Sequence, residues 1–550
     1  MTGHTRDELV KLAAALMCVA TVLLVAGCGG GSKSGSSQST TALNAYDASG
    51  KVLNLVAGSE QEKVLSDVVV PWCQQHGYTC HYTLLGSVDQ ARLLQSGNAP
   101  YDAFWFASSV FEELGNEKSV LKDVQPMFIT PIVFAGWKSE MQRLGLVGRQ
   151  VTIGDIVKLV ESKQTTTWAT NPTQSNSGAT ALFAFLTYFA GNPPTTQLSM
   201  QQLSTPRVQN AIKQFTRAIA KTPPSTGTMM DDCVAHPTQC KTVFTYEDLV
   251  IEKDQELVGQ GHEPLYAVYP QGGLAISDAP LGFLPHGTNA AKEKTFLALQ
   301  QYLLSPAGQA KVEAFGRRPH TSIGLSLPGA DPKVFNPAWG IRATVNEPIV
   351  HYPNASVIQT ALDNYQLSYR SPVSDYYCID GSGSMGANGG WDGVSNAAGL
   401  LFDPAQESKY LLQISPRDST TVDVFNDGLK GSWTVVGNKA SQLLALRDDI
   451  QALGPSGGTG IFRCLDRAAA HFQALPSQGV KRLVILMTDG MDNAGGSTSA
   501  IAALHIPVIA IGFGKDADMG TLQNIANETG GAALPATNVV QALRQATGYK

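Results

Sequence analysis

The chain has 550 residues, which is too long for one hydrophobic core and predicts three or four packing units. Its composition is that of a globular protein, with 43% hydrophobic, 15% charged and 8% aromatic residues. A net charge of −6 and the lack of any long basic run exclude a general nucleic-acid-binding protein.

The first 27 residues have the pattern of a secretory signal. Arg6 and Lys11 precede an apolar run over residues 12–27, which is short for a membrane span but suits a signal peptide. The run closes on "VAGC", which resembles the lipobox of bacterial lipoproteins and implies cleavage before Cys28 and lipidation of its thiol. The alternative is an uncleaved membrane anchor with Cys28 buried. Either reading predicts a chain held at the cell membrane on its extracytoplasmic face.

Residues 28–45 are rich in Gly, Ser and Thr and have no apolar period. Such a composition is typical of a flexible linker. We therefore expect a tether between the membrane and a folded body that begins near residue 46.

The cysteines also indicate an oxidising compartment. Six remain if Cys18 leaves with the signal and Cys28 carries lipid. Two pairs lie seven residues apart in polar segments, namely Cys73 with Cys80 and Cys233 with Cys240. We expect these pairs to form local disulfides, although six cysteines allow 15 pairings in principle. Cys378 and Cys464 either bridge each other or stay as free thiols in apolar sequence.

From residue 51 onward, apolar strand patterns alternate with helical ones. "VLNLVAG", "HYTLLG" and "YDAFWFASS" read as strands, and amphipathic helical segments separate them. Repeated strand–helix–strand units predict a largely parallel sheet, with ligands near the carboxyl ends of the strands.

Six stretches in this region resemble the two-lobed extracellular solute-binding proteins of bacterial transport systems. They are "LVAGSEQ", "GSVDQARLLQSGNAPYDAFWFASS", "FITPIVFAGWK", "TNPTQSNSGATALFAFL", "VFTYEDLVIE" and "PLYAVYPQGGLAISDAPLGFL". The resemblance implies a domain over residues 46–345 whose second lobe spans about 132–268. The chain would cross outward at 127–137 and return near 266–273, and a ligand would be enclosed between the lobes.

Hydroxyl-rich strand and helix ends supply the candidate contacts for a solute. Ser175 and Ser177 lie at the start of an apolar helix, where backbone N–H groups and hydroxyls favour an anion. The other candidates are Ser59, Ser108 and Ser109 at strand ends of the opposite lobe, with Tyr246 and Glu247 in "FTYEDL". Each serine alone could be an ordinary cap or turn residue. Together they predict a cleft for a small anionic or polar solute.

Residues 346–372 read as a connector with one helical stretch, and residues 373–550 return to an α/β pattern. Near-continuous apolar strands at 481–490 and 506–514 are expected in a parallel sheet covered on both faces. The fold class is therefore α/β throughout, with a two-lobed domain followed by a Rossmann-like, doubly wound domain.

The loop "CIDGSGSMG" at residues 378–386 contains two overlapping motifs. Its glycines spell G-x-G-x-x-G, which can mark a dinucleotide-binding turn. Asp380 would then lie beside the phosphates and repel them. The acids about 20 residues further on, Asp403 and Glu407, fall in a loop and helix pattern instead of at a strand end. These features disfavour a nucleotide site.

The second motif is a set of oxygen ligands. Asp380, Ser382 and Ser384 share the loop, while Thr459 precedes a helix and Asp489 follows a strand. This set resembles the metal-ion-dependent adhesion site of von Willebrand factor A (VWA) domains. The resemblance implies bound Mg²⁺, or alternatively Ca²⁺ or Mn²⁺, with a vacant position for a carboxylate of a protein partner.

These observations predict a membrane-anchored extracytoplasmic binding protein with metal-dependent adhesion and a solute-binding-like domain. The alternative is a transport solute-binding lipoprotein whose VWA domain is only a docking appendage. We expect no enzymatic activity, because no histidine lies in an H-E-x-x-H or G-x-S-x-G context.

Overall fold

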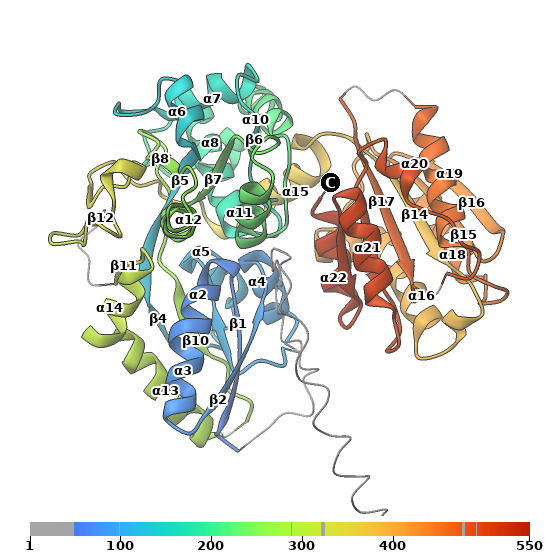
Figure 1. Cartoon of the computed structure of the whole chain (residues 1–550), viewed down its shortest axis with the longest axis horizontal. Helices are drawn as coiled ribbons and strands as arrows, with labels where there is room; N and C mark the ends of the chain where they lie inside the picture. The colour runs from blue at the N-terminus through green and yellow to red at the C-terminus, as the bar shows by residue number, and fades with distance from the viewer. Residues whose placement is uncertain are drawn as a thin grey trace, which may run out of the picture. The chain divides into compact units, whose positions relative to one another are not determined.

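The computed structural model describes residues 49–97, 99–287, 289–320, 325–475, 479–490 and 492–549 (Figure 1). The expected signal peptide, the tether and Cys28 lie outside the described residues. The described fold is mixed α/β, as the sequence predicted. Within this part of the chain, every helix is too short or too polar to cross a membrane.

The first lobe is built on a five-stranded sheet of order β2-β1-β3-β10-β4. The strands are β1 (Val52–Ala57), β2 (Thr79–Leu84), β3 (Ala103–Trp105), β4 (Lys122–Pro126) and β10 (Pro280–Phe283). The inner strand β1 pairs in parallel with β2 and β3, whereas β10 pairs antiparallel with β3. The helices that flank the sheet include α4 (Ser87–Gln95), α5 (Ser109–Gly115), α13 (Ala290–Leu304) and α14 (Pro306–Ala314). Strand β1 is almost fully buried, as expected for a parallel strand covered on both faces.

The second lobe contains the long strand β5 (Phe128–Trp137), which is the predicted outgoing crossover. It belongs to a sheet of order β11-β5-β7-β6, and β8 and β9 also pair with β5. The other strands are β6 (Thr167–Trp168), β7 (Thr242–Tyr246), β8 (Leu265–Val268), β9 (Ile276–Ser277) and β11 (Arg318–Pro319). The return to the first lobe follows β8 and β9, close to where the sequence placed it.

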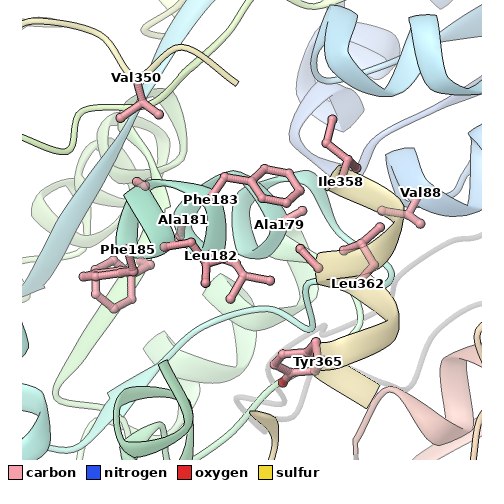
Figure 2. Close-up of a cluster of buried hydrophobic side chains, with 14 of the residues drawn as sticks. Val88, Ala179, Ala181, Leu182, Phe183, Phe185, Val350, Ile358, Leu362 and Tyr365 are labelled. Atoms are coloured by element: carbon pink, nitrogen blue, oxygen red, sulfur yellow. The ribbon is translucent and has the colours of Figure 1, made fainter. Parts of the chain in front are cut away.

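Helix α8 (Asn176–Ala190) forms the core of the second lobe (Figure 2). It is apolar around most of its circumference, which is the pattern of a helix that is buried on all sides. Figure 2 shows Phe183 and Leu182 of this helix near Ile358 and Leu362 of α15 (Ala355–Asn364). The segment expected to be a connector therefore contributes to the same hydrophobic core.

The C-terminal domain has a six-stranded sheet of order β16-β15-β14-β17-β18-β19. The strands are β14 (Val373–Asp380), β15 (Ser419–Phe425), β16 (Leu429–Val436), β17 (Lys481–Thr488), β18 (Val508–Gly512) and β19 (Ala532–Pro535). All neighbours pair in parallel except β16, which is the antiparallel edge strand.

Alternate residues of β14 face two separate cores. Tyr377 and Ile379 pack with helices α16 (Gly390–Leu401), α18 (Ala440–Gln451) and α22 (Val539–Thr547). Tyr376 and Cys378 pack with α19 (Ile461–Gln473), α20 (Ser499–Ala502) and α21 (Met519–Thr529). This alternation gives the doubly wound arrangement that the sequence predicted.

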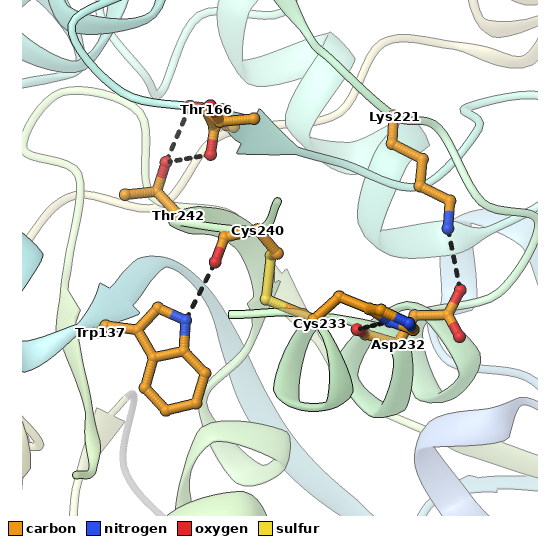
Figure 3. The surroundings of a disulfide bond; sticks show 9 residues. Trp137, Thr166, Lys221, Asp232, Cys233, Cys240 and Thr242 are labelled. Atoms are coloured by element: carbon orange, nitrogen blue, oxygen red, sulfur yellow. Dashed lines mark hydrogen bonds and ion pairs between the residues drawn. A yellow bond between two sulfur atoms is a disulfide. The ribbon is translucent and has the colours of Figure 1, made fainter. Parts of the chain in front are cut away.

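Both expected cysteine pairs, Cys73–Cys80 and Cys233–Cys240, are bonded in the structure. Figure 3 shows the Cys233–Cys240 bridge, beside which Trp137 Nε1 donates a hydrogen bond to the carbonyl of Cys240 at 2.9 Å. The sequence left open whether Cys378 and Cys464 pair or stay free. In the structure, Cys378 of β14 is bonded to Cys464 of α19.

Helix α22 contacts the solute-binding region through a buried side chain. Arg544 is 2% exposed and forms an ion pair with Asp89 of α4 in the first lobe. It also donates a hydrogen bond to the carbonyl of Thr173 in the second lobe, and Gln174 donates back to the carbonyl of Arg544. The last helix of the chain is thus anchored to both lobes.

Candidate functional site

The predicted metal-binding residues meet at one edge of the C-terminal sheet. Asp380 is the last residue of β14 and Asp489 follows β17, which is its parallel neighbour. Parallel strands bring their carboxyl ends to the same edge, so the two carboxylates lie on adjacent loops. Thr459 lies on the loop before α19.

Hydrogen bonds fix the first loop. Asp380 Oδ1 accepts from the backbone N–H of Ser382 at 2.8 Å, and Asp380 Oδ2 accepts from Thr488 Oγ1 at 2.5 Å. The hydroxyl oxygens of Ser382 and Ser384 lie 3.1 Å apart. The side chain of Asp380 is therefore held in place from two sides.

The other loops are tied to the first through their backbones. Gly383 N donates to the carbonyl of Gly457 at 3.0 Å. Asn493 Oδ1 accepts from Thr459 N at 2.8 Å, and Asn493 N donates to the carbonyl of Thr459 at 2.9 Å. Three segments distant in sequence thus form one rigid edge, which we call the metal-loop edge (residues 380–384, 456–459 and 488–493, without Met491).

Most of the predicted ligands at this edge are buried, and two of them are carboxylates. Asp380 and Ser382 are fully buried and Asp489 is 8% exposed, whereas Ser384 is exposed. Burial raises the pKa of Asp380 to about 6 and the nearby Asp489 adds to the rise, against hydrogen bonds from Thr488 and Ser382 that lower it. A divalent cation would relieve both the burial and the repulsion between the carboxylates.

The donor set fits a hard divalent cation. Its two carboxylates and three hydroxyls supply only oxygen, which Mg²⁺ prefers, and few of these oxygens carry charge. Among the residues that the structure describes, no group of three or more His, Cys, Asp or Glu side chains is placed to hold a metal ion. A site at this edge would therefore depend on hydroxyl ligands as much as on carboxylates.

Sequence reasoning missed three residues that support this edge. They are Thr488, Asn493 and Lys430, whose Nζ donates to the Gly381 carbonyl and to Ser456 Oγ, both at 3.0 Å. Thr488 directly precedes Asp489 and could have been found from that position. Lys430 lies on the edge strand β16, and no local pattern marks it.

The candidate solute-binding serines lie where the two lobes touch. Ser59 Oγ of the first lobe accepts from Gly227 N of α11 (Thr226–Ala235) at 3.0 Å. The neighbouring Thr226 Oγ1 lies 3.0 Å from Ser175 Oγ and 2.7 Å from Ser177 Oγ. Three of the predicted serines thus meet at one polar contact between the lobes, which we call the interlobe seam.

Tyr246 lies at the same seam and is fully buried. Its hydroxyl accepts from Asn176 Nδ2 at 3.0 Å, and the same amide donates to Ser277 Oγ at 2.7 Å. Burial raises the pKa of Tyr246 well above its ordinary value, and the negative charge of Glu60 adds to the rise. Glu60, which follows Ser59, is therefore a further seam residue that the sequence reasoning missed.

The remaining candidates have other partners in the structure. Ser108 caps α5 by accepting from Val110 N at 3.4 Å, and Ser109 donates to Asp278. Glu247 accepts from Arg318 Nε at 2.9 Å and from Arg318 Nη2 at 2.8 Å. Because both oxygens of Glu247 are occupied by a buried guanidinium, its predicted ligand contact stays a prediction.

A second buried guanidinium crosses the seam. Arg317 Nε lies 3.1 Å from Asp248 Oδ2, and the side chain also contacts Glu252 and the carbonyl of Glu60. Burial raises the pKa of both Glu60 and Asp248 to about 7, and the charge of Arg317 lowers each of them. The seam thus holds more acidic groups than basic ones.

Two family matches cover most of the chain. Residues 53–318 match the family described as bacterial extracellular solute-binding protein. Residues 408–534 match the von Willebrand factor type A domain, and this range includes Thr459 and Asp489 but begins after the loop of Asp380. The chain is also 28% identical over 194 residues to "Uncharacterized protein YwmC" of Bacillus subtilis (strain 168), which covers 32% of this chain and 82% of that protein.

The chain is also similar to solved structures. The sulfate-binding protein SubI from Mycobacterium tuberculosis H37Rv is 14% identical with a TM-score of 0.40, over 57% of this chain and 99% of that one. An aerotolerance-related membrane protein from Bacteroides fragilis NCTC 9343 is 19% identical with a TM-score of 0.26, over 32% of this chain and 98% of that one. Residues 53–318 thus match a bacterial solute-binding-protein family and residues 408–534 a VWA domain, and the described architecture is α/β in both regions.

Proposed function

We propose that the protein is a membrane-anchored extracytoplasmic binding protein whose VWA domain binds a protein partner through a divalent cation. The observation that supports this proposal is that the five predicted oxygen ligands lie on adjacent loops of the metal-loop edge. They are Asp380, Ser382, Ser384, Thr459 and Asp489. The lipobox-like sequence before Cys28 supports the anchor.

Different residues of this edge would contact the ion and its bound waters. The hydroxyls of Ser382, Ser384 and Thr459 would contact the ion, and Asp380 and Asp489 would hold its bound waters. Mg²⁺ supplies a Lewis-acidic position that attracts a carboxylate of the partner. The hydrogen bonds from Thr488 to Asp380 and from Asn493 to Thr459 keep the loops in register for that contact.

The solute-binding domain would bind a small polar solute at the interlobe seam. Its two sheets, the crossover strand β5 and the polar contacts between the lobes support this role. We propose binding in place of catalysis for both domains, because the seam and the metal-loop edge each present oxygen ligands without a nucleophile–base pair. His286, a possible base, instead has its ring Nε2 2.8 Å from the carbonyl of Tyr101.

A second candidate function is solute capture for a transporter, with the VWA domain as a docking appendage. The anchoring of Arg544 to both lobes favours an integrated role over a loose appendage. Tight solute binding that is unaffected by mutation of the VWA domain would favour the transport alternative.

The metal site is tested by titrating the exported chain with Mg²⁺ and Mn²⁺ in a calorimeter. We expect Asp380→Ala to abolish measurable binding, because it removes a buried carboxylate that also orients Ser382 and Thr488. Asp449→Ala is the matched control, since Asp449 is exposed on α18.

Two outcomes would count against the metal site. One is unchanged Mg²⁺ affinity in Asp380→Ala, and the other is partner binding that persists in EDTA. Circular dichroism of the variant checks that the solute-binding domain stays folded, so that a loss of metal affinity is not mistaken for unfolding.

A further inference from the structure

Three buried side chains at the interlobe seam have an oxygen atom with no hydrogen-bond partner. They are Glu60 Oε1, Gln61 Oε1 and Asn176 Oδ1. The side chains are at most 5% exposed, so water does not reach them freely. Buried acceptors without a donor are costly, and each one needs an explanation.

The donor groups of these side chains are already used by the protein. Asn176 Nδ2 donates to both the Tyr246 hydroxyl and Ser277 Oγ, so its amide can offer only the carbonyl oxygen. Gln61 Nε2 donates to the carbonyl of Phe106 at 3.3 Å, so the side chain of Gln61 also has its carbonyl oxygen left to offer. The side chains of Glu60, Gln61 and Asn176 therefore each present an acceptor oxygen at the seam.

Glu60 and Asn176 lie on opposite sides of the seam. The hydroxyl of Tyr246 is bonded to Asn176, and the negative charge of Glu60 adds to the rise of the Tyr246 pKa. Glu60 comes from the first lobe and the other two residues from the second. Both lobes thus contribute a buried acceptor without a partner to the seam.

Above about pH 7, the charge balance of the seam is negative. Three carboxylates, those of Glu60, Asp248 and Glu252, surround the guanidinium of Arg317. The terminal nitrogens of that guanidinium contact Glu252 and the carbonyl of Glu60, and its Nε lies 3.1 Å from Asp248 Oδ2. An inorganic oxyanion placed here would lie beside Glu60 and meet like charge in a buried setting.

The N-terminus of α8, which suggested an anionic solute, carries a smaller charge than an ionised Glu60 carboxylate. The N-terminus of α8 contributes at most about half a positive charge. The hydroxyls of Ser175 and Ser177, which were expected to strengthen it, are bonded to Thr226. Above about pH 7, where the Glu60 carboxylate is ionised, its negative charge therefore outweighs the helix.

We propose that the solute of this domain is a small organic cation with N–H donors, such as an ammonium or a guanidinium group. Glu60 is the charged acceptor, and the side-chain carbonyls of Gln61 and Asn176 accept the remaining N–H groups. This inference rests on the proposed solute-binding function and replaces the anionic solute that the sequence favoured. The solute reaches these atoms when the two lobes separate, because they are buried when the lobes touch.

Thermal-shift and calorimetric titrations of the full exported chain test the proposal. The cationic probes are ethylammonium, putrescine and agmatine, and the anionic probes are inorganic sulfate and phosphate. We expect at least one cationic probe to raise the Tm, since a ligand that binds only the folded state stabilises it. The Glu60→Gln variant should bind that probe about tenfold more weakly or worse, as expected when a charged acceptor is lost.

The matched control is Glu62→Gln, which removes a carboxylate two residues away, and it should leave the affinity unchanged. Asn176→Asp provides a second variant in case Glu60→Gln folds poorly. It places another carboxylate at the seam, to which Tyr246 and Ser277 can donate, and should strengthen cation binding severalfold.

The outcomes separate this inference from the proposed function. If sulfate or phosphate stabilises the protein and the cations do not, the solute-binding function stands and the cationic class is wrong. If no probe of either class binds, the cationic class is also refuted. The Mg²⁺ titration of the same sample then still reports on the VWA domain. Equal cation affinity in Glu60→Gln and the parent chain would overturn the role of Glu60.

Discussion

The metal-loop edge and the interlobe seam are both built from polar residues near strand ends, but they are held together differently. At the metal-loop edge, backbone groups of neighbouring loops bind each other directly, as Gly383 with Gly457 and Asn493 with Thr459 do. At the seam, side chains of one lobe contact the other lobe, as Ser59 does with Gly227 N, and the buried guanidinium of Arg317 donates to the carbonyl of Glu60.

This difference indicates which site has its binding geometry before a ligand arrives. Loops tied by backbone hydrogen bonds keep their geometry without a ligand, and such a preorganised site loses little free energy to ordering when it binds. A seam made of buried acceptors and ion pairs is stable only while the lobes touch or while a ligand fills it. We therefore expect the metal-loop edge to be rigid and the seam to respond to its solute.

Removing the Cys378–Cys464 bridge should have the largest effect on stability. The bridge spans 86 residues, and closing a loop of this length stabilises the folded state by about 4–5 kcal/mol. The double variant Cys378→Ala/Cys464→Ala should lower the free energy of unfolding of the VWA domain by about that amount in urea titrations. Its Mg²⁺ affinity should change by less than about threefold, because hydrogen bonds hold the loop.

The matched control for this variant is Cys73→Ala/Cys80→Ala, whose loop spans only 7 residues and should contribute about 2–3 kcal/mol. A large loss of Mg²⁺ affinity in the Cys378 variant would show that the disulfide, and not the hydrogen-bonded loops, preorganises the metal-loop edge.

Replacing Glu247 distinguishes a structural carboxylate from a ligand-binding one. The Glu247→Gln substitution leaves Arg318 buried without its charged partner, which should cost about 3–4 kcal/mol of folding free energy. The measurement is urea unfolding of the solute-binding domain by circular dichroism. Glu256→Gln on the exposed side of α12 (Glu247–Gly259) is the control and should be nearly neutral.

A different result would assign Glu247 to the binding site. If Glu247→Gln leaves the stability unchanged but removes solute binding, then the sequence-based assignment of this residue to the ligand is correct. In that case the ion pair with Arg318 gives way when the solute binds.

The smallest expected effect comes from a buried carboxylate outside the seam. Burial raises the pKa of Asp254 to about 8 from 3.8, so folding favours its protonated form. The stability that this group contributes is present below about pH 4 and is lost as the pH rises toward about 8. Asp254→Asn should raise the free energy of unfolding by about 2 kcal/mol near pH 8 and change it little near pH 4.

The introduced asparagine can keep the hydrogen bond that Asp254 Oδ1 accepts from Leu265 N at 2.6 Å. Comparing urea unfolding curves of the variant and the parent chain at the two pH values checks the prediction. An equal stability change at both pH values would mean that the carboxylate is not held neutral by burial.

The metal-loop edge was largely predictable from the sequence. Asp380, Ser382 and Ser384 occupy one short loop, so their proximity does not depend on the rest of the fold. Thr459 and Asp489 could be added because parallel strands collect their carboxyl ends at one edge. Their supports Asn493 and Lys430 could not be predicted, since each reaches another loop through contacts that no spacing rule specifies.

Local spacing also identified the bridges Cys73–Cys80 and Cys233–Cys240, because seven residues of chain keep the two sulfurs close. The pairing of Cys378 with Cys464 was decided only by the tertiary structure, which packs α19 on the face of β14 where Cys378 points. The same is true of Glu247 and Glu60. A long charged side chain binds whichever partner the packed lobes bring within reach, and sequence distance carries no information about that partner.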